Sequence, residues 1–344
     1  MAAVTMRDIA RLAGGVHQST VSLALRNAPV ISLATRMRIQ RIARTAGYHR
    51  DPLLDAFNVR RVQSRQSRSH PVLAFVSDFD SRKAMEASPL HASLWRGAAH
   101  AAESLYHRLE PFFLGPRGLS PVRLDSILFN RGIDGLVTAA FRPTTPPLRL
   151  AWERYCGVRV ECQNWRSPHI TVATDLLQGT RTAFRRAKQL GYNRIGLLLE
   201  PDENARNDLA LAGYLVEHAK VTGHPAPLVA PQFRSAARLR EWIKSNRIDA
   251  ILSAGTGTGG LLAAIDLQPG RDLGWACLAL SRPDRSIAGL VADSERAGAL
   301  AVEQVVGLSR LNLRGPASSA MITYVPSTWQ DGASLPSRHL LGGV

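Results

Sequence analysis

The sequence contains few cysteines and no long apolar run, and both absences restrict the class of protein. Its three cysteines, Cys156, Cys162 and Cys277, are odd in number and lack the spacing of metal ligands, so we expect free, buried thiols in a reducing compartment. No stretch reaches the roughly 18 apolar residues that a membrane-spanning helix needs. The N-terminus, MAAVTMRDIARL, also lacks the apolar core of a secretory signal. These features predict a cytoplasmic protein with no membrane partner.

Patterns typical of catalysis are missing as well. The ten histidines are scattered, and no nucleophile elbow, Ser–His–Asp arrangement or metal-ligand cluster is evident. Asp175 and Asp293 are better explained as residues at the edges of lobes than as a catalytic carboxylate pair. The sequence therefore predicts a protein that is not an enzyme and that needs neither a cofactor nor a metal.

Acidic residues are scarce at the N-terminus, where basic residues are abundant. Residues 1–70 contain 12 arginines, no lysine and only three acids, and the whole chain has a formal net charge of +16. Planar guanidinium groups suit phosphate oxygens and guanine edges. A basic excess concentrated in one terminal module favours nucleic acid as the partner over a merely charged, soluble surface.

The pattern of apolar residues predicts three short helices in this basic segment. Apolar side chains recur at helical spacing in Met6–Ala13, Val21–Leu25 and Ile39–Ala46. Thr5 and Asp8 can form a capping box at the start of the first helix, and Ser32 can cap the third. Gly14–Gly15 ends the first helix and Gly47 the third.

Three short helices, a tight turn and a basic surface are typical of a helix-turn-helix module, whose second helix directs its N-terminal residues into the major groove. His17, Gln18 and Ser19 then lie where side chains reach base edges, and a glutamine amide pairs well with adenine. Thr20 and Ser22 are better placed for phosphates. The predicted solvent face of the third helix comprises Arg36, Arg38, Gln40, Arg41 and Arg44. The alternative is a small helical bundle in which the polar residues only cap the second helix.

The segments TMRDIARLAG, STVSLALRN, ISLATRMRIQRIARTAGY and DPLL resemble the N-terminus of regulators of the lactose-repressor (LacI) family. The resemblance implies a hinge segment after Gly47–Tyr48, a body of two periplasmic-binding-protein-like lobes, and a homodimer. It also implies which residues contact DNA: Thr5, His17, Gln18, Ser19, Thr20 and Ser22.

Three positions depart from the family pattern. Gly14–Gly15 is one residue longer than the family's single glycine, which could re-aim the second helix. Leu23 stands where many members have a base-reading arginine, so a thymine methyl is its expected neighbour. Phe57 falls at the family's minor-groove wedge, where an aromatic ring can also insert. Asp55 replaces an arginine that would face phosphates, which leaves insertion of the hinge a hypothesis.

After the polar segment VQSRQSRSH, strands and amphipathic helices alternate, which predicts parallel sheets covered by helices. The clearest strands are expected at Val72–Val76, Gly135–Ala139, Ile195–Leu199, Ile248–Ser253 and Ala276–Leu280. The segment around Asp134 is echoed about 115 residues later around Asp249, since both have Ile-Asp before an apolar strand. Two lobes of one topology are the simplest explanation.

The predicted architecture is therefore an all-α helix-turn-helix head joined to a two-lobed α/β body. The head with its hinge comprises residues 1–60, a linker residues 61–71, and the body residues 72–344. The first lobe is expected at about residues 72–163 and 288–313, and the second at about 164–287 and 320–344.

A small-molecule effector of unknown identity is expected between the lobes, as in the family. Several positions lack the usual sugar-binding side chains, so a typical sugar inducer is not predicted. The candidate effector-binding residues are Trp95, Trp165, Arg166, Arg206, Asp208, Thr256 and Ser281. For each tryptophan, ordinary core packing is the favoured alternative.

The run Gly255-Thr-Gly-Thr-Gly-Gly260 raises a different hypothesis. It matches G-x-G-x-x-G between a predicted strand and a predicted helix, which is typical of phosphate binding. Its place in the middle of a lobe argues against a dinucleotide site.

The sequence thus predicts a sequence-specific transcription regulator, a repressor that binds a near-palindromic operator as a dimer. Its expected partners are double-stranded DNA, a second copy of the chain and an effector, and its expected location is the nucleoid. Two alternatives stay open: an effector-independent architectural DNA binder, and a nucleotide-sensing α/β protein that uses Gly255–Gly260.

Overall fold

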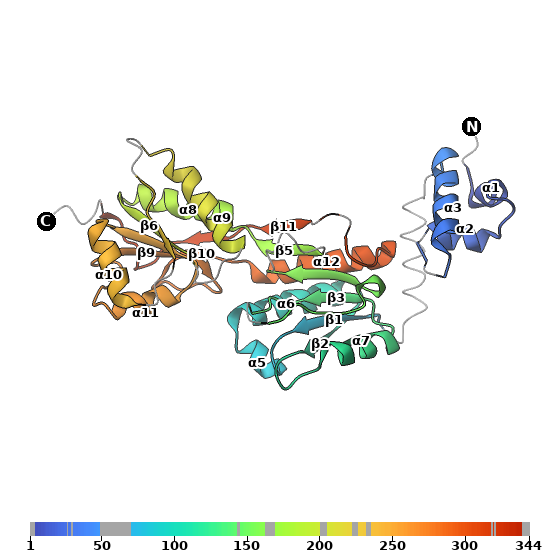
Figure 1. Ribbon diagram of the computed structural model, residues 1–344, viewed down its shortest axis with the longest axis horizontal. Coiled ribbons are helices and arrows are strands. Elements are labelled where there is room, and N and C mark those ends of the chain that lie inside the picture. The colour runs from blue at the N-terminus through green and yellow to red at the C-terminus, as the bar shows by residue number, and fades with distance from the viewer. Residues whose placement is uncertain are drawn as a thin grey trace.

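The computed structural model describes residues 4–25, 27–28, 30–48, 70–142, 145–161, 169–199, 205–221, 226–231, 235–317, 319 and 321–338. Figure 1 shows a small helical head beside a longer body. The two parts touch where the Asn312 side chain donates a hydrogen bond to the backbone oxygen of Asn27. Among the helices within these ranges, none is long and apolar enough to cross a membrane.

The head consists of the three helices that the sequence predicts: α1 (Met6–Leu12), α2 (Gln18–Leu25) and α3 (Leu33–Thr45). Thr5 and Asp8 form the predicted capping box, and the Ser32 hydroxyl caps α3. Ile9, Val21 and Ile39 are fully buried, one from each helix. One apolar face per helix therefore builds a small common core.

The body contains two six-stranded sheets of almost entirely parallel strands. The first has the order β11-β5-β4-β3-β1-β2 and the second β12-β10-β9-β8-β6-β7. The strands of the first sheet are β1 (Val72–Ser77), β2 (Arg108–Phe113), β3 (Gly135–Thr138), β4 (Cys156–Val160), β5 (Ile170–Thr174) and β11 (Ile322–Val325). Those of the second are β6 (Ile195–Leu199), β7 (Val229–Pro231), β8 (Ala250–Ser253), β9 (Gly274–Leu280), β10 (Ala288–Val291) and β12 (Thr328–Gln330).

The two sheets repeat one topology, since β1 to β5 take the same places in the first as β6 to β10 in the second. The strands after the echoed Ile-Asp pairs, β3 and β8, are each the third strand of their sheet along the chain, and they occupy equivalent positions. The prediction of two lobes with one topology is confirmed.

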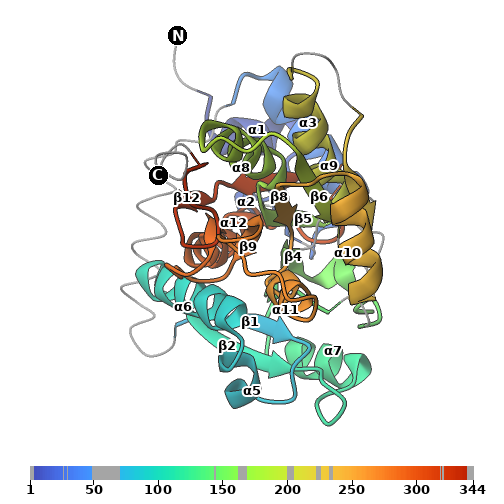
Figure 2. The same cartoon turned by 90° about the vertical axis from the view of Figure 1, so that its left-hand side faces the viewer.

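Helices cover both faces of each sheet. The first sheet packs on α6 (Pro89–Ser104) and α12 (Ser294–Leu311) on one face and on α7 (Pro121–Asn130) on the other. The second packs on α8 (Leu176–Gln189) and α9 (Ala205–His218) and, across the sheet, on α10 (Ala236–Ser245) and α11 (Gly257–Ala263). Figure 2 views these two helix pairs around β6, β8 and β9. A short helix, α5 (Arg82–Glu86), and a 3-10 turn, η1 (Trp152–Arg154), complete the first lobe.

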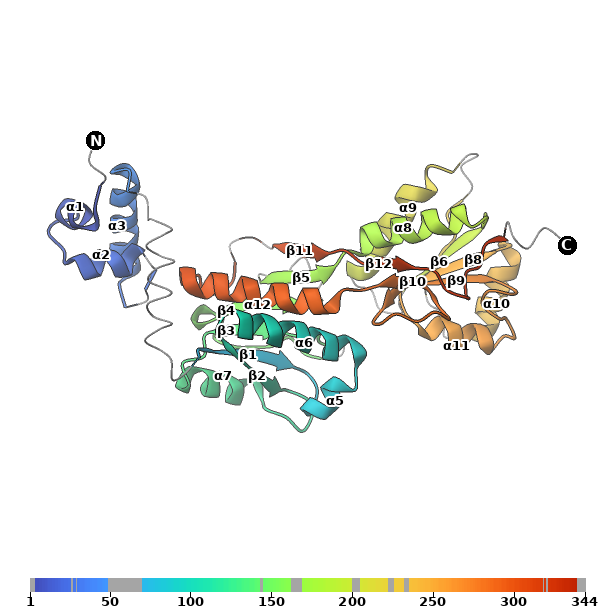
Figure 3. The ribbon, with the colours of Figure 1, turned by 180° about the vertical axis from the view of Figure 1, so that it is seen from behind.

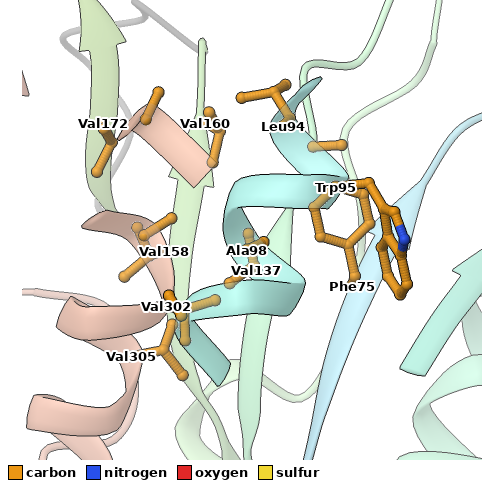
Figure 4. Packing of buried hydrophobic residues seen from close by; sticks show 14 of the residues in the cluster. Phe75, Leu94, Trp95, Ala98, Val137, Val158, Val160, Val172, Val302 and Val305 are labelled. Atoms are coloured by element: carbon orange, nitrogen blue, oxygen red, sulfur yellow. The ribbon is translucent and has the colours of Figure 1, made fainter. Parts of the chain in front are cut away.

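Helices α6 and α12 lie side by side along the first sheet (Figure 3). A β-carbon added to Gly97 would lie 1.9 Å from the backbone oxygen of Glu295, and one added to Gly298 would lie 2.1 Å from that of Leu94. Glycine at both positions therefore permits the close approach. Valines of β3, β4, β5 and α12 fill the space beneath (Figure 4).

The chain crosses between the lobes three times, after β5, β10 and β11. Asp175 caps α8 and Asp293 caps α12 at two of these crossings, so both carboxylates have structural roles at the lobe edges. The predicted crossings are wrong in detail. Ile170–Thr174 and Ile322–Val325 belong to the first sheet, and Ala288–Val291 belongs to the second. Apolar strands of similar composition carry no information about which of two like sheets they join.

Two of the cysteines, Cys156 and Cys277, are buried free thiols, as expected. Burial raises the pKa of Cys156 to about 12 and also raises that of Cys277. Cys162 lies outside the described residues.

Candidate functional site

The N-terminal turn of α2 presents the polar side chains predicted to contact bases. The backbone carbonyl of His17 accepts hydrogen bonds from the N–H groups of Thr20 and Val21 at 2.9 and 3.3 Å. Its Nδ1 atom lies 2.7 Å from Ser19 Oγ and accepts a hydrogen bond from the Ser19 N–H at 3.3 Å. His17 therefore caps α2, while Gln18 and Ser19 are exposed on its first turn.

Gly14 and Gly15 both lie in the turn before α2. Gly14 and Gly15 have φ angles of +84° and +76°, a region that L side chains rarely adopt. The N–H of Gly15 donates to the carbonyl of Ala10 at 3.0 Å, which closes the end of α1. Because Val21 and Ala24 are fully buried beyond this turn, α2 is firmly packed on the head core.

Four other predicted DNA contacts lie around this helix. Thr5 is exposed, but its hydroxyl donates to Asp8 Oδ2 at 2.6 Å within the capping box. Hydrogen bonds from the Thr5 side chain and backbone lower the pKa of Asp8. Thr20, Ser22 and Leu23 are half-buried on α2. The predicted hinge residue Phe57 lies outside the described residues.

Arg36 is half-buried on α3 rather than fully exposed, and its contact with DNA stays a prediction. Its guanidinium turns inward and donates to the carbonyl of Asn27 at 3.0 Å. Gln40, one turn further along α3, donates to Ala24 O at 2.9 Å and Asn27 Oδ1 at 2.7 Å. Both side chains therefore donate to oxygen atoms at the C-terminal end of α2 or just beyond it. They join α3 to the end of α2, and the exposed arginines among the described residues of the head are Arg7, Arg11, Arg38, Arg41 and Arg44.

In the body, polar groups gather at the carboxyl ends of the first sheet's strands, where open α/β sheets bind ligands. Asp78 follows β1 and is 1% exposed. Its Oδ2 accepts hydrogen bonds from Thr145 Oγ1 at 2.6 Å and from the Arg142 backbone and Nε at 2.9 and 3.0 Å. Burial alone would raise the pKa of Asp78, but these hydrogen bonds hold it below its usual value. Its Oδ1 is buried and has no hydrogen-bond partner among the described residues.

A buried histidine supports this cluster. The ring nitrogens of His91 lie 2.9 Å from Ser88 Oγ and 2.8 Å from Ala140 O, and its ring packs edge-on against Phe79. Burial lowers the pKa of His91, so the imidazole is neutral at physiological pH. The Arg142 guanidinium lies over the Phe79 ring, 5.5 Å from its centroid.

An ion pair connects the two lobes at the same edge. Glu161 follows β4 of the first sheet, and its side chain is only 3% exposed. Its Oε1 accepts hydrogen bonds from Thr174 Oγ1 and N at 2.5 and 3.1 Å, and its Oε2 lies 3.2 Å from Arg206 Nη1 at the start of α9. A carboxylate of the first lobe is therefore paired with a guanidinium of the second.

The remaining predicted effector residues lie in different parts of the body. Thr256 and Ser281 follow β8 and β9, on the carboxyl edge of the second sheet, and Asp208 is exposed on the first turn of α9. Trp95 is 8% exposed and packs edge-on against Phe75 (Figure 4), which agrees with the alternative of ordinary core packing. Trp165 and Arg166 lie outside the described residues.

The glycine-rich run has a packing role. A β-carbon at Gly259 would lie 3.0 Å from the ring of Trp275, so glycine here admits a large aromatic side chain. The helix that it opens, α11, has only seven residues.

Sequence reasoning missed Asp78, Arg142 and Glu161. A carboxylate directly after a run of apolar strand residues was the available signal, in VLAFVSD for Asp78 and in CGVRVE for Glu161. The contact between Arg142 and Asp78, which are 64 residues apart, has no sequence signal.

Comparison with known proteins agrees with both parts of this structure. Residues 5–51 match the family model described as bacterial regulatory proteins, lacI family. The HTH-type transcriptional repressor CytR of Escherichia coli (strain K12) is 25% identical over 226 residues, which cover 62% of this chain and 58% of CytR. The maltose regulon regulatory protein MalI of the same strain is 27% identical over 197 residues, 57% of this chain and 53% of MalI. The chain thus matches somewhat more than half the length of these relatives.

Two solved structures share the fold over almost the whole chain. A complex of the transcriptional regulator CelR with cellobiose has a TM-score of 0.59 at 19% identity, covering 96% of this chain and 99% of CelR. The lac repressor dimer bound to operator and the anti-inducer ONPF has a TM-score of 0.55 at 16% identity, covering 97% and 100%.

Proposed function

We propose that this chain is a regulator of the LacI family and that it represses transcription by binding a near-palindromic DNA operator as a homodimer. The observation that carries the proposal is the first turn of α2, where Gln18 and Ser19 are exposed on a helix fixed by a buried core and surrounded by arginines. In a helix-turn-helix module this turn enters the major groove, and a dimer would place two such turns one helical repeat of DNA apart. Such a protein acts in the cytoplasm, on the nucleoid.

Selection of random duplex DNA by the purified chain at physiological salt tests the proposal. An enriched palindrome with two half-sites is expected, together with a dimer in sedimentation. Gln18→Ala should weaken binding of that sequence about tenfold and relax preference at one base position, since a bidentate side-chain contact is worth roughly 1–3 kcal/mol. Gln268→Ala, which removes an exposed glutamine from the second lobe, is the matched control.

The inward position of Arg36 gives this experiment a second comparison. Arg38→Ala removes an exposed cation and should weaken binding to all sequences while lowering the salt dependence. Arg36→Ala should instead loosen the head, because it leaves the Asn27 carbonyl without this donor. Retention of DNA without any motif, with a steep salt dependence, would support the architectural alternative.

An effector is the second part of the proposal, and its site is the edge where the lobes meet. CelR was solved with cellobiose, a small molecule. In this chain a ligand donor could satisfy Asp78 Oδ1, and Arg206, Thr256 and Ser281 would face it from the second lobe. Any such ligand must act on the Glu161–Arg206 pair, because that pair already joins the lobes. A ligand that prefers one angle between the lobes would shift the DNA-competent population.

Screening small polyols and sugars for release of the selected operator tests this part. A compound that releases DNA from the wild type, and fails to do so in Asp78→Asn, would support the cleft site. Release that is equal in both proteins would place the effector elsewhere.

A further inference from the structure

Helix α12 runs from a crossing between the lobes to the head. It is capped by Asp293, just after β10, and its C-terminal end points toward the head in two opposite views (Figures 1 and 3). The helix ends at Asn312, whose φ and ψ angles of +52° and +40° are left-handed. Asparagine is one of the few residues that tolerate this conformation. Asn312 therefore both ends the helix and supplies a polar side chain at its tip.

The body fixes the orientation of the Asn312 amide, which has one accepting and one donating end. Its Oδ1 accepts a hydrogen bond from Arg314 Nε at 2.9 Å. The Arg314 guanidinium also donates to the backbone oxygen of Arg154 at 2.9 Å and to Asp134 Oδ2 at 2.8 Å. Because Oδ1 faces this arginine, Nδ2 faces the other way and donates to the backbone oxygen of Asn27 in the head. The contact with the head is thus the end of a hydrogen-bonded chain that begins beside β3.

The second lobe uses the corresponding aspartate within the lobe. Since β3 and β8 take equivalent places in their sheets, strand register matches Asp134 with Asp249 and Thr138 with Ser253. Asp249 accepts hydrogen bonds at 2.8 Å from the N–H groups of the two residues before β6, and Arg338 Nη1 lies 3.3 Å from it. These contacts join segments of one lobe. In the first lobe, the arginine paired with Asp134 also orients the residue that holds the head.

On the head side, the contact reaches both helices of the helix-turn-helix. Asn27 follows the C-terminal end of α2, and its carbonyl also accepts a hydrogen bond from Arg36 of α3 at 3.0 Å. Its side-chain Oδ1 accepts a hydrogen bond from Gln40 Nε2, one turn further along α3, at 2.7 Å. The residue that the body holds is therefore the one that joins α2 to α3, so the two helices should move together.

The contact lies at the opposite end of α2 from the residues predicted to read bases. Gln18 and Ser19 are exposed on the first turn, whereas Asn27 lies beyond the last helical residue, Leu25. Eight residues of α-helix span about 12 Å. The contact therefore leaves the first turn of α2 uncovered, as expected if the body presents this turn to DNA.

We propose that Asn312 is a positioning residue for DNA recognition, which seats the head on the tip of α12 and directs the first turn of α2 away from the body. In a dimer, two seated heads would hold their recognition turns at one separation, so less orientational freedom is lost when DNA binds. That separation would select one spacing between half-sites. The role in recognition rests on the proposed function, but the seating itself can be measured without DNA.

Time-resolved fluorescence anisotropy of the full chain without DNA measures the seating. A dye is attached to Thr45→Cys at the exposed end of α3, in a Cys162→Ser background, because the other two thiols are buried. With Asn312 intact, the dye should rotate slowly with the whole molecule. Asn312→Gly removes the amide but suits left-handed backbone, so it should keep the fold and add the fast rotation of an independent head. Asn312→Asp should do the same, because it keeps the acceptor for Arg314 and places an oxygen against the Asn27 carbonyl.

Operator binding measures the consequence for recognition. Asn312→Gly should bind the selected DNA sequence about tenfold more weakly, since each of two heads loses one hydrogen bond to the body. Two base pairs inserted between the half-sites should weaken the wild type at least about tenfold but Asn312→Gly only about threefold, because a freed head can follow its half-site. Asn246→Asp is the matched control for Asn312→Asp, because it makes the same charge change at the C-cap of α10 in the second lobe.

Two results would overturn the proposal. One is fast rotation of the dye in the DNA-free chain with Asn312 intact, since the head would then not be seated. The other is an equal loss of affinity in the wild type and Asn312→Gly when the half-sites are moved apart. If the chain selects no DNA sequence, the proposed function and the role in recognition fail together, whereas slow rotation that is lost in Asn312→Gly would still establish the seating.

Discussion

The two lobes have the same strand order but differ in the side chains on one face of the sheet. This is the face away from α6 and α12 in the first lobe and away from α8 and α9 in the second. The second lobe closes that face with Trp275, Cys277 and Ile287, whereas the first has Gly157, Arg159 and His169 at the matched positions. One backbone arrangement thus supports a packed apolar layer in one copy and a pocket beside Trp152 in the other. The difference teaches that topology alone does not decide how a sheet face is filled, because the indole ring at this place comes from strand β9 in the second lobe and from Trp152, before β4, in the first.

The largest expected effect is on stability, to which Trp275 should contribute more than Trp152. Trp275→Ala should lower the free energy of unfolding by roughly 3–5 kcal/mol, because it leaves a cavity and an unpaired Ser253. Trp152→Ala should cost only about 1–2 kcal/mol, since Trp152 is half-buried beside an existing pocket. Urea unfolding of both variants measures this, and equal losses would contradict the comparison.

The second prediction concerns acid sensitivity, which only the first lobe should have at this position. His169 has a folded pKa of about 4 against an ordinary value of 6.5, so only the unfolded chain binds its proton between these values. The free energy of unfolding should therefore fall as the pH drops from 6.5 to about 4, by roughly 3 kcal/mol from this residue. His169→Leu, which introduces an aliphatic residue as at Ile287, should remove that part of the pH dependence. If the free energy of unfolding of the wild type and of His169→Leu changed with pH in the same way, His169 would not be the residue responsible.

The third prediction tests the contact between the lobes. Arg206→Leu leaves the buried Glu161 without this cation and should lower the free energy of unfolding by about 2 kcal/mol. This loss is smaller than the loss expected on breaking a fully buried ion pair, because the Arg206 side chain is 24% exposed. The exposed pair Arg240–Asp266 provides the control, and Arg240→Leu should cost less than about 0.5 kcal/mol. If both variants unfold at the same urea concentration, the inter-lobe pair contributes nothing measurable.

The smallest effect separates the two matched hydroxyl groups. Ser253→Ala removes the acceptor of the Trp275 indole and should cost about 1 kcal/mol. Thr138→Val removes a hydroxyl without a described partner, so the free energy of unfolding should stay the same or rise slightly. Thermal unfolding in the same buffer compares the two, and a clear loss in Thr138→Val would mean that its hydroxyl is satisfied.

Much of the fold could be predicted from the sequence because it rests on local patterns. The capping box at Thr5, the strand at Gly135–Thr138 and the repeat around Asp134 and Asp249 are all signals carried by neighbouring residues. The inward turn of Arg36 could not be predicted in this way. An amphipathic pattern shows which face of α3 is apolar, but it does not show which polar side chains at the edge of that face find a buried carbonyl.

The sequence by itself determined the head, its charge and the alternation of strands and helices, because periodicity, capping and charge depend on residues close together in the chain. The tertiary structure alone decided the crossings between lobes, the Glu161–Arg206 pair and the pocket beside Trp152. Each depends on residues that are distant in sequence and become neighbours only through strand register. That is why Gly157 and Trp275, unrelated when read along the chain, prove to be the same position in two copies of one sheet.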